Sequence, residues 1–174
     1  MAVLALAVLP ASAQVKHIQT ERSPIATAVW AGNTLYVSGQ LPNPTTAAAD
    51  GKPAVYGNTH QQAQSALEKI DVILKEQGLG MGNVVKMQVF LVGDPGLGNK
   101  LDFAGLQASY TKWFGTREQP NKPARPAAER GGLLLPGFVL LLVPYALRDH
   151  VARRLRDVCA GLSFQLADEE VPFL

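Results

Sequence analysis

The spacing of apolar residues changes from a helical period to a strand period within residues 59–91. Apolar side chains first recur at helical spacing, at Ala63, Ala66, Leu67, Ile70 and Leu74. Thr59 and Gln62 fit a capping box at the start of this helix, and Gly78 fits its end. Apolar residues then alternate, at Val85, Met87, Val89 and Leu91. A helix followed directly by a half-buried strand predicts a fold in which helices pack on a sheet.

Further elements are predicted on both sides of this segment. Residues 34–37 are rich in strand-forming residues and follow the turn dipeptide Gly32-Asn33, so they predict a strand. Residues 41–58 contain three prolines and two glycines, which predicts a loop with a short strand at 54–56. A second helix is predicted where one face gathers Phe103, Leu106, Tyr110 and Trp113 or Phe114, with Gly115 closing it.

The last strands are predicted at 133–135 and 138–143, after a proline-rich approach. The resulting order is strand, strand, helix, strand, helix, strand, strand. This order predicts an α+β fold, in which two helices cover one face of a mixed β-sheet.

Composition limits the classes of function. The 174 residues are 47% hydrophobic and 17% charged, which is typical of one globular domain with a core. The 16 basic and 14 acidic residues leave a net charge of +2, which excludes a strongly basic nucleic-acid-binding protein. Cys159 is the only cysteine, and the three histidines are far apart in the sequence. We therefore expect no metal, no other cofactor and no nucleic-acid partner.

The first 13 residues have features of a secretory signal peptide. Residues 1–9 are almost purely apolar, and Ala11-Ser12-Ala13 fits a small-x-small cleavage site before Gln14. Cleavage there would place the protein in the periplasm or outside the cell. The usual positively charged start is missing, so a first β-strand or an apolar terminus of a cytoplasmic protein is the alternative.

The C-terminal region is predicted to stay off the membrane. Its longest apolar run, 133–147, has 15 residues broken by prolines, against the ~18–20 of a membrane span. Apolar residues then recur at helical spacing from Leu147 to Leu162, with arginines on other faces. Packing of that apolar stripe on the domain is favoured over binding to a membrane or an acidic partner. The predicted organisation is a signal peptide at 1–13, a domain at 14–147 and a tail at 148–174.

Several stretches in sequence order resemble one known family. They are Ser23-Pro24, the run from Ala31 to Gln40, the predicted helix and strand at 62–91, Asp102-Phe103-Ala104, Tyr110-x-x-Trp113-Phe114 and Lys122-Pro123-Ala124-Arg125. Over about 23–125 the chain resembles the Rid family, the reactive-intermediate deaminases also called YjgF or L-PSP endoribonuclease-like proteins. The resemblance implies a chorismate-mutase-like protomer. It also implies a homotrimer with small-molecule clefts between subunits.

The resemblance also implies a site and a reaction. Active members hydrolyse 2-imino or enamine acids to 2-keto acids and ammonia. The family arginine falls on Arg125, whose planar fork suits bidentate binding of a carboxylate. Gly39 falls where backbone lines the cleft, with Ser38 beside it, and Gln107 falls at the family's asparagine. A structural arginine, a strand-end turn at Gly39 and a solvent-facing Gln107 are the alternative interpretations.

Two departures from the family pattern bear on catalysis. Ile25 stands where active members have a tyrosine in the substrate site, and Leu141 stands at about the position of the glutamate that orients the attacking water. Glu129 is the nearest carboxylate in sequence, and we expect it in a solvated loop because 126–130 is a poor strand. Two explanations stay open for the ending after Arg125: divergence, or a shifted reading frame near codon 126.

Three classes of function remain. The first is a Rid-type deaminase with weakened activity, because loss of a general base costs ~10²–10⁴ in rate. The second is a trimer of the same family that binds small carboxylates such as keto acids without catalysis. The third, less favoured, is an endoribonuclease, which the near-neutral charge and the lack of an aromatic–basic cluster oppose.

Overall fold

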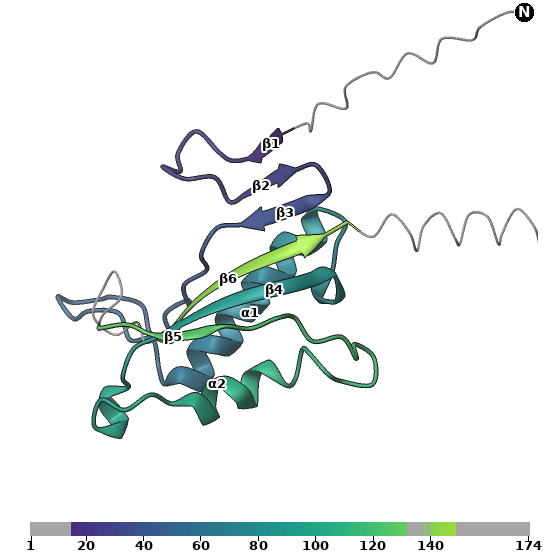
Figure 1. Ribbon diagram of the computed structural model, residues 1–174. Coiled ribbons are helices and arrows are strands. Elements are labelled where there is room, and N and C mark those ends of the chain that lie inside the picture. Colours follow the sequence, from purple (N-terminus) through teal and green to yellow (C-terminus); the bar gives the residue numbers. More distant parts are fainter. Residues whose placement is uncertain (1–14, 132–137, 139, 149–174) are drawn as a thin grey trace, which may run out of the picture.

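The computed structural model describes residues 15–131, 138 and 140–148 of the chain, as an α+β unit (Figure 1). The strands are β1 (Val15–Ile18), β2 (Ala28–Ala31), β3 (Thr34–Val37), β4 (Val84–Leu91), β5 (Ala127–Glu129) and β6 (Leu140–Leu147). The helices are α1 (Thr59–Glu76) and α2 (Phe103–Tyr110), with short 3₁₀ turns at Met81–Asn83 and Pro95–Leu97. The predicted fold class is confirmed. The predicted signal peptide, the strand at 133–135 and the tail beyond Arg148 lie outside the described residues.

The six strands form one mixed sheet in the order β1-β2-β3-β6-β4-β5. All neighbouring strands run antiparallel except β4 and β5, which are parallel. The strand predicted at 34–37 is confirmed as β3. The strands β1 and β2 were not predicted, because four residues are too few to show a clear alternation; β3 is equally short and was predicted from its strand-forming residues after a turn dipeptide.

Both helices pack on one face of this sheet, and one core fills the space between them (Figure 1). The core contains the apolar stripe of α1 predicted from its spacing, together with Leu106 and Tyr110 of α2. From the central strands it contains Leu35, Val37, Met87, Val89, Leu91, Leu140, Leu142 and Ala146. Because side chains alternate along a strand, the residues between them face away from the helices.

The capping box of α1 lies one residue earlier than predicted. Asn58 is the N-cap, and its side chain accepts from the backbone N–H of Gln61 at 3.0 Å while Gln61 reaches back to the backbone of Asn58. Thr59 and Gln62 are buried and bond elsewhere, to the carboxylate of Asp94 and to the carbonyl of Gly57. Both pairs fit the same sequence spacing, and tertiary contacts decide between them. Gly78 ends the helix with φ +71° as predicted.

Two predicted apolar faces are partly wrong. Val85 is exposed because an irregularity in the pairing between Val84 and Lys86 shifts the alternation of β4 by one residue, so Val84 is the buried valine. Phe103 was predicted on the buried face of α2 but is 48% exposed. α2 also ends at Tyr110, well before Gly115. Asp102 caps its start by accepting from the N–H of Gly105 at 2.7 Å.

The C-terminal strands also differ from the prediction. The segment at 127–129 is a strand, β5, which pairs in parallel with β4, although its sequence predicted a loop. β6 runs from Leu140 to Leu147 and so passes through Pro144. The ladder to β3 pairs Tyr145 with Tyr36 and resumes where Leu142 pairs with Gln40. Pro144 lies between these two pairs, so its missing N–H removes no hydrogen bond to β3.

Candidate functional site

Arg125 is held in place by backbone bonds on both sides. The carbonyl of Ala124 accepts from the N–H of Met87 at 2.9 Å, and that of Pro126 accepts from the N–H of Val89 at 3.0 Å. The backbone around Arg125 therefore extends β5 along β4. Because Met87 points into the core, the arginine opposite it extends towards the helical layer and reaches α2.

One face of α2 surrounds the guanidinium group of Arg125. Its Nη2 donates to Oε1 of Gln107 at 2.9 Å. The guanidinium carbon lies 4.3 Å from the ring centroid of Tyr110 and 5.2 Å from that of Phe103. These three residues stand at i, i+4 and i+7 on α2, so they share one side of the helix. Two residues of the face predicted as core, Phe103 and Tyr110, therefore also form, with Gln107, the wall that orients Arg125.

The Arg125 guanidinium retains unused hydrogen-bonding capacity. Its Nη1 is buried and has no hydrogen-bond partner among the described residues. Burial raises the pKa of the Tyr110 phenol, with the positive charge of Arg125 opposing the shift, so this ring stays neutral at physiological pH. A buried N–H without a partner costs ~1–3 kcal/mol. A carboxylate oxygen from a ligand would satisfy Nη1 and pair with the charge.

α2 is fixed in turn to the start of α1. Ser109, which is fully buried, donates through Oγ to the carbonyl of His60 at 2.8 Å and lies 2.8 Å from Nδ1 of the same residue. This contact joins the two helices beside Gln107 and Tyr110. The wall around Arg125 is therefore anchored to α1.

Ser38, Gly39 and Ile25 form a second group. Oγ of Ser38 donates to the carbonyl of Ala26 at 2.6 Å, so its proton is used to hold the segment that carries Ile25. Ile25 itself is 63% exposed. Gly39 lies against Leu141: a methyl group at Gly39 would come 2.8 Å from Cδ1 of Leu141. Leu141, which the family resemblance places at about the glutamate position, is therefore next to Gly39.

The two groups lie apart within one chain. Gln40, next to Gly39, pairs with Leu142 of β6; Leu142 pairs with Val89 of β4, and Val89 pairs with Ala127 of β5. Gln40 and the β5 segment that follows Arg125 are therefore three strand spacings apart, which is about 14 Å. Arg125 reaches the helical layer, whereas Leu141 and Gly39 meet on the other face. The structure thus joins Arg125 with Gln107, and Ser38 with Gly39 and the Ile25 segment, without joining the two groups.

Other candidate chemistry is limited in the described part of the chain. Glu129 is exposed on β5, so its side chain is solvated as expected even though its backbone is a strand. No three His, Cys, Asp or Glu side chains gather as metal ligands within residues 15–131, 138 and 140–148. Over the same residues, neither helix has the length and apolarity needed to span a membrane. The sequence did not identify Tyr110 and Phe103 as site residues, although their spacing from Gln107 places all three on one side of a helix.

Comparisons with known proteins agree with this fold. Residues 19–138 match the sequence model of the family described as Endoribonuclease L-PSP. A RutC family protein of Pasteurella multocida is 34% identical over 120 residues, which cover 66% of this chain and 84% of the relative. The 2-iminobutanoate/2-iminopropanoate deaminase of Escherichia coli is 32% identical over 120 residues, with the same coverage. The crystal structure of yeast Mmf1 superposes with a TM-score of 0.60 and 28% identity, covering 78% of this chain and all of that one.

Proposed function

This chain belongs to the Endoribonuclease L-PSP family, which includes the YjgF and RutC proteins, and from that membership we propose that it hydrolyses short 2-imino acids and their enamine tautomers to 2-keto acids and ammonia. The observation that supports this most is the Arg125 guanidinium. It is oriented by Gln107, flanked by two aromatic rings, and has a buried Nη1 without a partner among the described residues. A 2-imino acid offers the carboxylate that this arrangement lacks.

The proposed reaction needs only water as co-reactant. Water adds to C2 of the protonated imine and gives a carbinolamine. One proton of the added water passes to nitrogen, which makes it an ammonium leaving group. The C–N bond then breaks as the remaining hydroxyl proton leaves to solvent, which releases ammonia and the 2-keto acid. Arg125 holds the substrate carboxylate, so that C2 stays in one position while water approaches. Leu141 supplies no base to orient that water, so the proposed activity is weak, by ~10²–10⁴ relative to a site with a carboxylate.

We propose that the site is completed in a homotrimer. Gly39 and Arg125 are too far apart in one chain for one small imino acid to touch both. The sheet face away from the helices also presents apolar and aromatic side chains, including the 45% exposed Tyr36 and its edge-to-face partner Tyr145. A half-exposed apolar sheet face is a surface that a second copy of the chain covers.

A second candidate function is a trimer that binds small carboxylates without turning them over. It is favoured by Leu141 and Ile25, which provide neither a base nor a hydroxyl where active relatives have them. The same Arg125 clamp would then bind a keto acid.

We further propose that residues 1–13 direct export of the protein and that cleavage leaves Gln14 as its first residue.

One assay separates these functions. An amino-acid oxidase generates 2-iminopropanoate or 2-iminobutanoate continuously, and semicarbazide traps the imine that remains. If the full chain is a deaminase, it lowers trapping and releases ammonia faster than buffer does. If it binds pyruvate or 2-oxobutanoate by calorimetry but does not change the trapping rate, the binding function is correct and the enzymatic one is wrong.

A further inference from the structure

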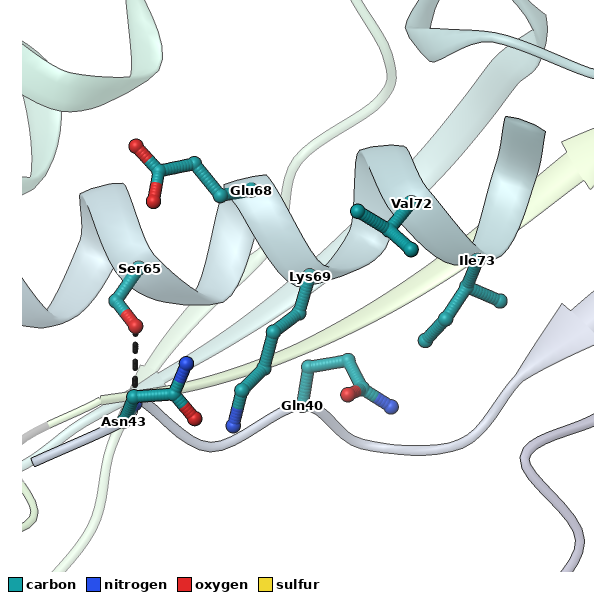
Figure 2. A pocket seen from close by; sticks show the side chains of 7 residues that line it. All are labelled: Gln40, Asn43, Ser65, Glu68, Lys69, Val72 and Ile73. Atoms are coloured by element: carbon teal, nitrogen blue, oxygen red, sulfur yellow. Dashed lines mark hydrogen bonds between the residues drawn. The ribbon is translucent and has the colours of Figure 1, made fainter. Parts of the chain in front are cut away.

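A pocket away from Arg125 lies between the outer side of α1 and the segment that follows Gly39 (Figure 2). Its volume is about 330 Å³, within the range of small-molecule sites. The side chains of Gln40 and Asn43 form one wall, and those of Lys69, Val72 and Ile73 on α1 form the other. Arg125 and the rings of Phe103 and Tyr110 are not among the residues that line it. We call this the α1 pocket.

One end of the α1 pocket has a cation that lacks a counter-ion. Nζ of Lys69 donates to the carbonyl of Leu41 at 2.9 Å, which uses one of its three N–H groups. Among the described residues, no carboxylate forms a salt bridge with Lys69. Burial lowers the pKa of its ammonium group. The side chain of Asn43 lies beside it in Figure 2, and the N–H of Asn43 is held by Oγ of Ser65 at 2.9 Å. The Lys69 ammonium group and the Asn43 side-chain amide therefore lie at the same end, with the amide oxygen on the side of Lys69 in Figure 2.

The other end of the pocket is apolar. Val72 and Ile73 lie one turn further along α1, about 5 Å from the level of Lys69 along the helix axis. Val72 is 55% exposed, although it is aliphatic and one turn away from a polar cluster. A ligand that fits both ends has an anionic head and a short aliphatic tail.

The charge around the pocket favours a head with one negative charge. Lys69 is the one cation among the described residues that line the pocket, whereas the carboxylate of Glu68 accepts from Nε2 of Gln64 at 2.7 Å and is directed away from Lys69 in Figure 2. A doubly charged phosphate loses more hydration on binding than a carboxylate does, and one cation offsets only part of that loss. A carboxylate needs only the ammonium group of Lys69, and rotation of the Asn43 side-chain amide would supply one further donor.

We propose that the α1 pocket is a second binding site, and that it takes a short aliphatic monocarboxylate whose head binds Lys69 and Asn43 and whose tail packs on Val72 and Ile73. This site is distinct from the Arg125 clamp and does not depend on the proposed deaminase activity. Gln40 lies between the α1 pocket and the Ser38–Gly39 group, since its Nε2 donates to the carbonyl of Ser38 at 2.8 Å.

The probe for the test is hexanoate, titrated into the full chain and followed by calorimetry and by NMR shifts. We expect shifts on α1 from Ser65 to Ile73 and at 40–43. Acetate, which lacks the tail, and hexyl phosphate, which has a doubly charged head, should both bind more weakly. Lys69→Met should weaken hexanoate binding by roughly ten- to a hundredfold, the usual effect of losing a charge-assisted bond. Glu68→Gln should strengthen binding.

Lys75→Met is the matched control. It removes a lysine of the same helix that lies outside the pocket, where its Nζ is paired with Asp71 at 2.6 Å. The NMR shifts at the α1 pocket should be unchanged in Lys75→Met, and they should persist in Arg125→Ala, which removes any hexanoate bound by the proposed clamp. If Lys69→Met is poorly folded, Val72→Glu tests the apolar end at an exposed position, and it should weaken binding as strongly. The proposal is overturned if hexanoate shifts residues around Arg125 only, if binding is lost in Arg125→Ala, or if the pocket variants bind like the parent.

Discussion

The side chain of Leu141 occupies the space that a side chain at Gly39 would need. A Cβ at Gly39 would lie 2.8 Å from Cδ1 of Leu141, well inside the ~3.5–4.0 Å of a normal contact between carbon atoms. Gly39 is not among the glycines with positive φ, so any residue could adopt its backbone conformation. The glycine is therefore explained by the close approach of β6.

Gly39→Ala should destabilise the protein because of this contact. Overpacking of this kind costs ~1–3 kcal/mol, and Leu141→Ala should remove most of the cost. The free energies of unfolding of the two single variants and the double variant give the coupling between the sites. Gly80→Ala is the control, because a Cβ there meets no atom within 4 Å and its φ is −144°. An equal cost of Gly39→Ala in both backgrounds would contradict this explanation.

Leu141→Glu should increase hydrolysis of 2-imino acids. Leu141 is half-buried beside Gly39, so a carboxylate there would stand at the family's glutamate position and could orient water. We expect a gain of at least tenfold in kcat/KM in the oxidase-coupled assay. Leu141→Gln is the matched control, since it has nearly the same shape without a base. Equal rates for the two variants would show that the missing carboxylate is not what limits turnover.

The sequence predicted the parts of this fold that have long, regular periods. The stripe of α1, the stop at Gly78 and the strand at 34–37 all depend on local spacing, and the structure confirms them. The errors come from tertiary contacts. Val85 was predicted to be buried but is exposed, because one irregularity in the β4–β6 pairing shifts the alternation. Thr59 was predicted in the capping box but does not cap α1, because its hydroxyl donates to the carboxylate of Asp94. β5 exists because β4 offers an open edge, which no pattern within 127–129 encodes.

The sequence named candidate site residues but not their arrangement. A family resemblance selected Arg125, Gln107 and Gly39, and it could not state that Gln107 binds Nη2 or that Tyr110 lies under the guanidinium. These relations depend on how α2 sits beside β5. The separation of Gly39 from Arg125 likewise depends on strand order, because β6 enters the sheet between β3 and β4.

The assembly prediction is a homotrimer held by the helix-free face of the sheet. Light scattering of the full chain should give about three times the mass of one chain. Tyr36→Lys places a charge on that face and should shift the protein towards monomer. Val72→Lys is the control, because Val72 is similarly exposed but lies on α1, in the opposite layer. A monodisperse monomer of the parent at micromolar concentration would refute the trimer and the cleft between its subunits.

The export prediction concerns the first 13 residues. Expressed with its own N-terminus in a bacterium, the protein should be found outside the cytoplasm with Gln14 as its first residue. Mass spectrometry of the fractionated cells measures both. Ala13→Arg should block cleavage, since the site requires a small residue before the cut. An intact Met1 in the cytoplasmic fraction would contradict export.

Arg125→Ala should abolish most of the imine hydrolysis that is measured for the parent protein. Loss of a charge-assisted carboxylate contact costs ~1.5–3 kcal/mol, which is roughly ten- to a hundredfold in kcat/KM or in keto-acid affinity. Arg125→Lys should restore little, because an ammonium group cannot reproduce the fork held by Gln107 and flanked by Tyr110. The trimer should survive in both variants.

Arg130→Ala provides the matched control for this substitution. Arg130 follows β5 on the same segment and also lies over an aromatic ring, with its guanidinium carbon 5.0 Å from the ring centroid of Phe90. It is exposed, so its removal takes the same charge from the same region without touching the clamp. If the effect of Arg125→Ala came only from net charge or from lost stacking, Arg130→Ala would reproduce it. A tenfold loss in the first variant and none in the second would assign the carboxylate to Arg125, whereas equal rates in all three proteins would remove Arg125 from the site.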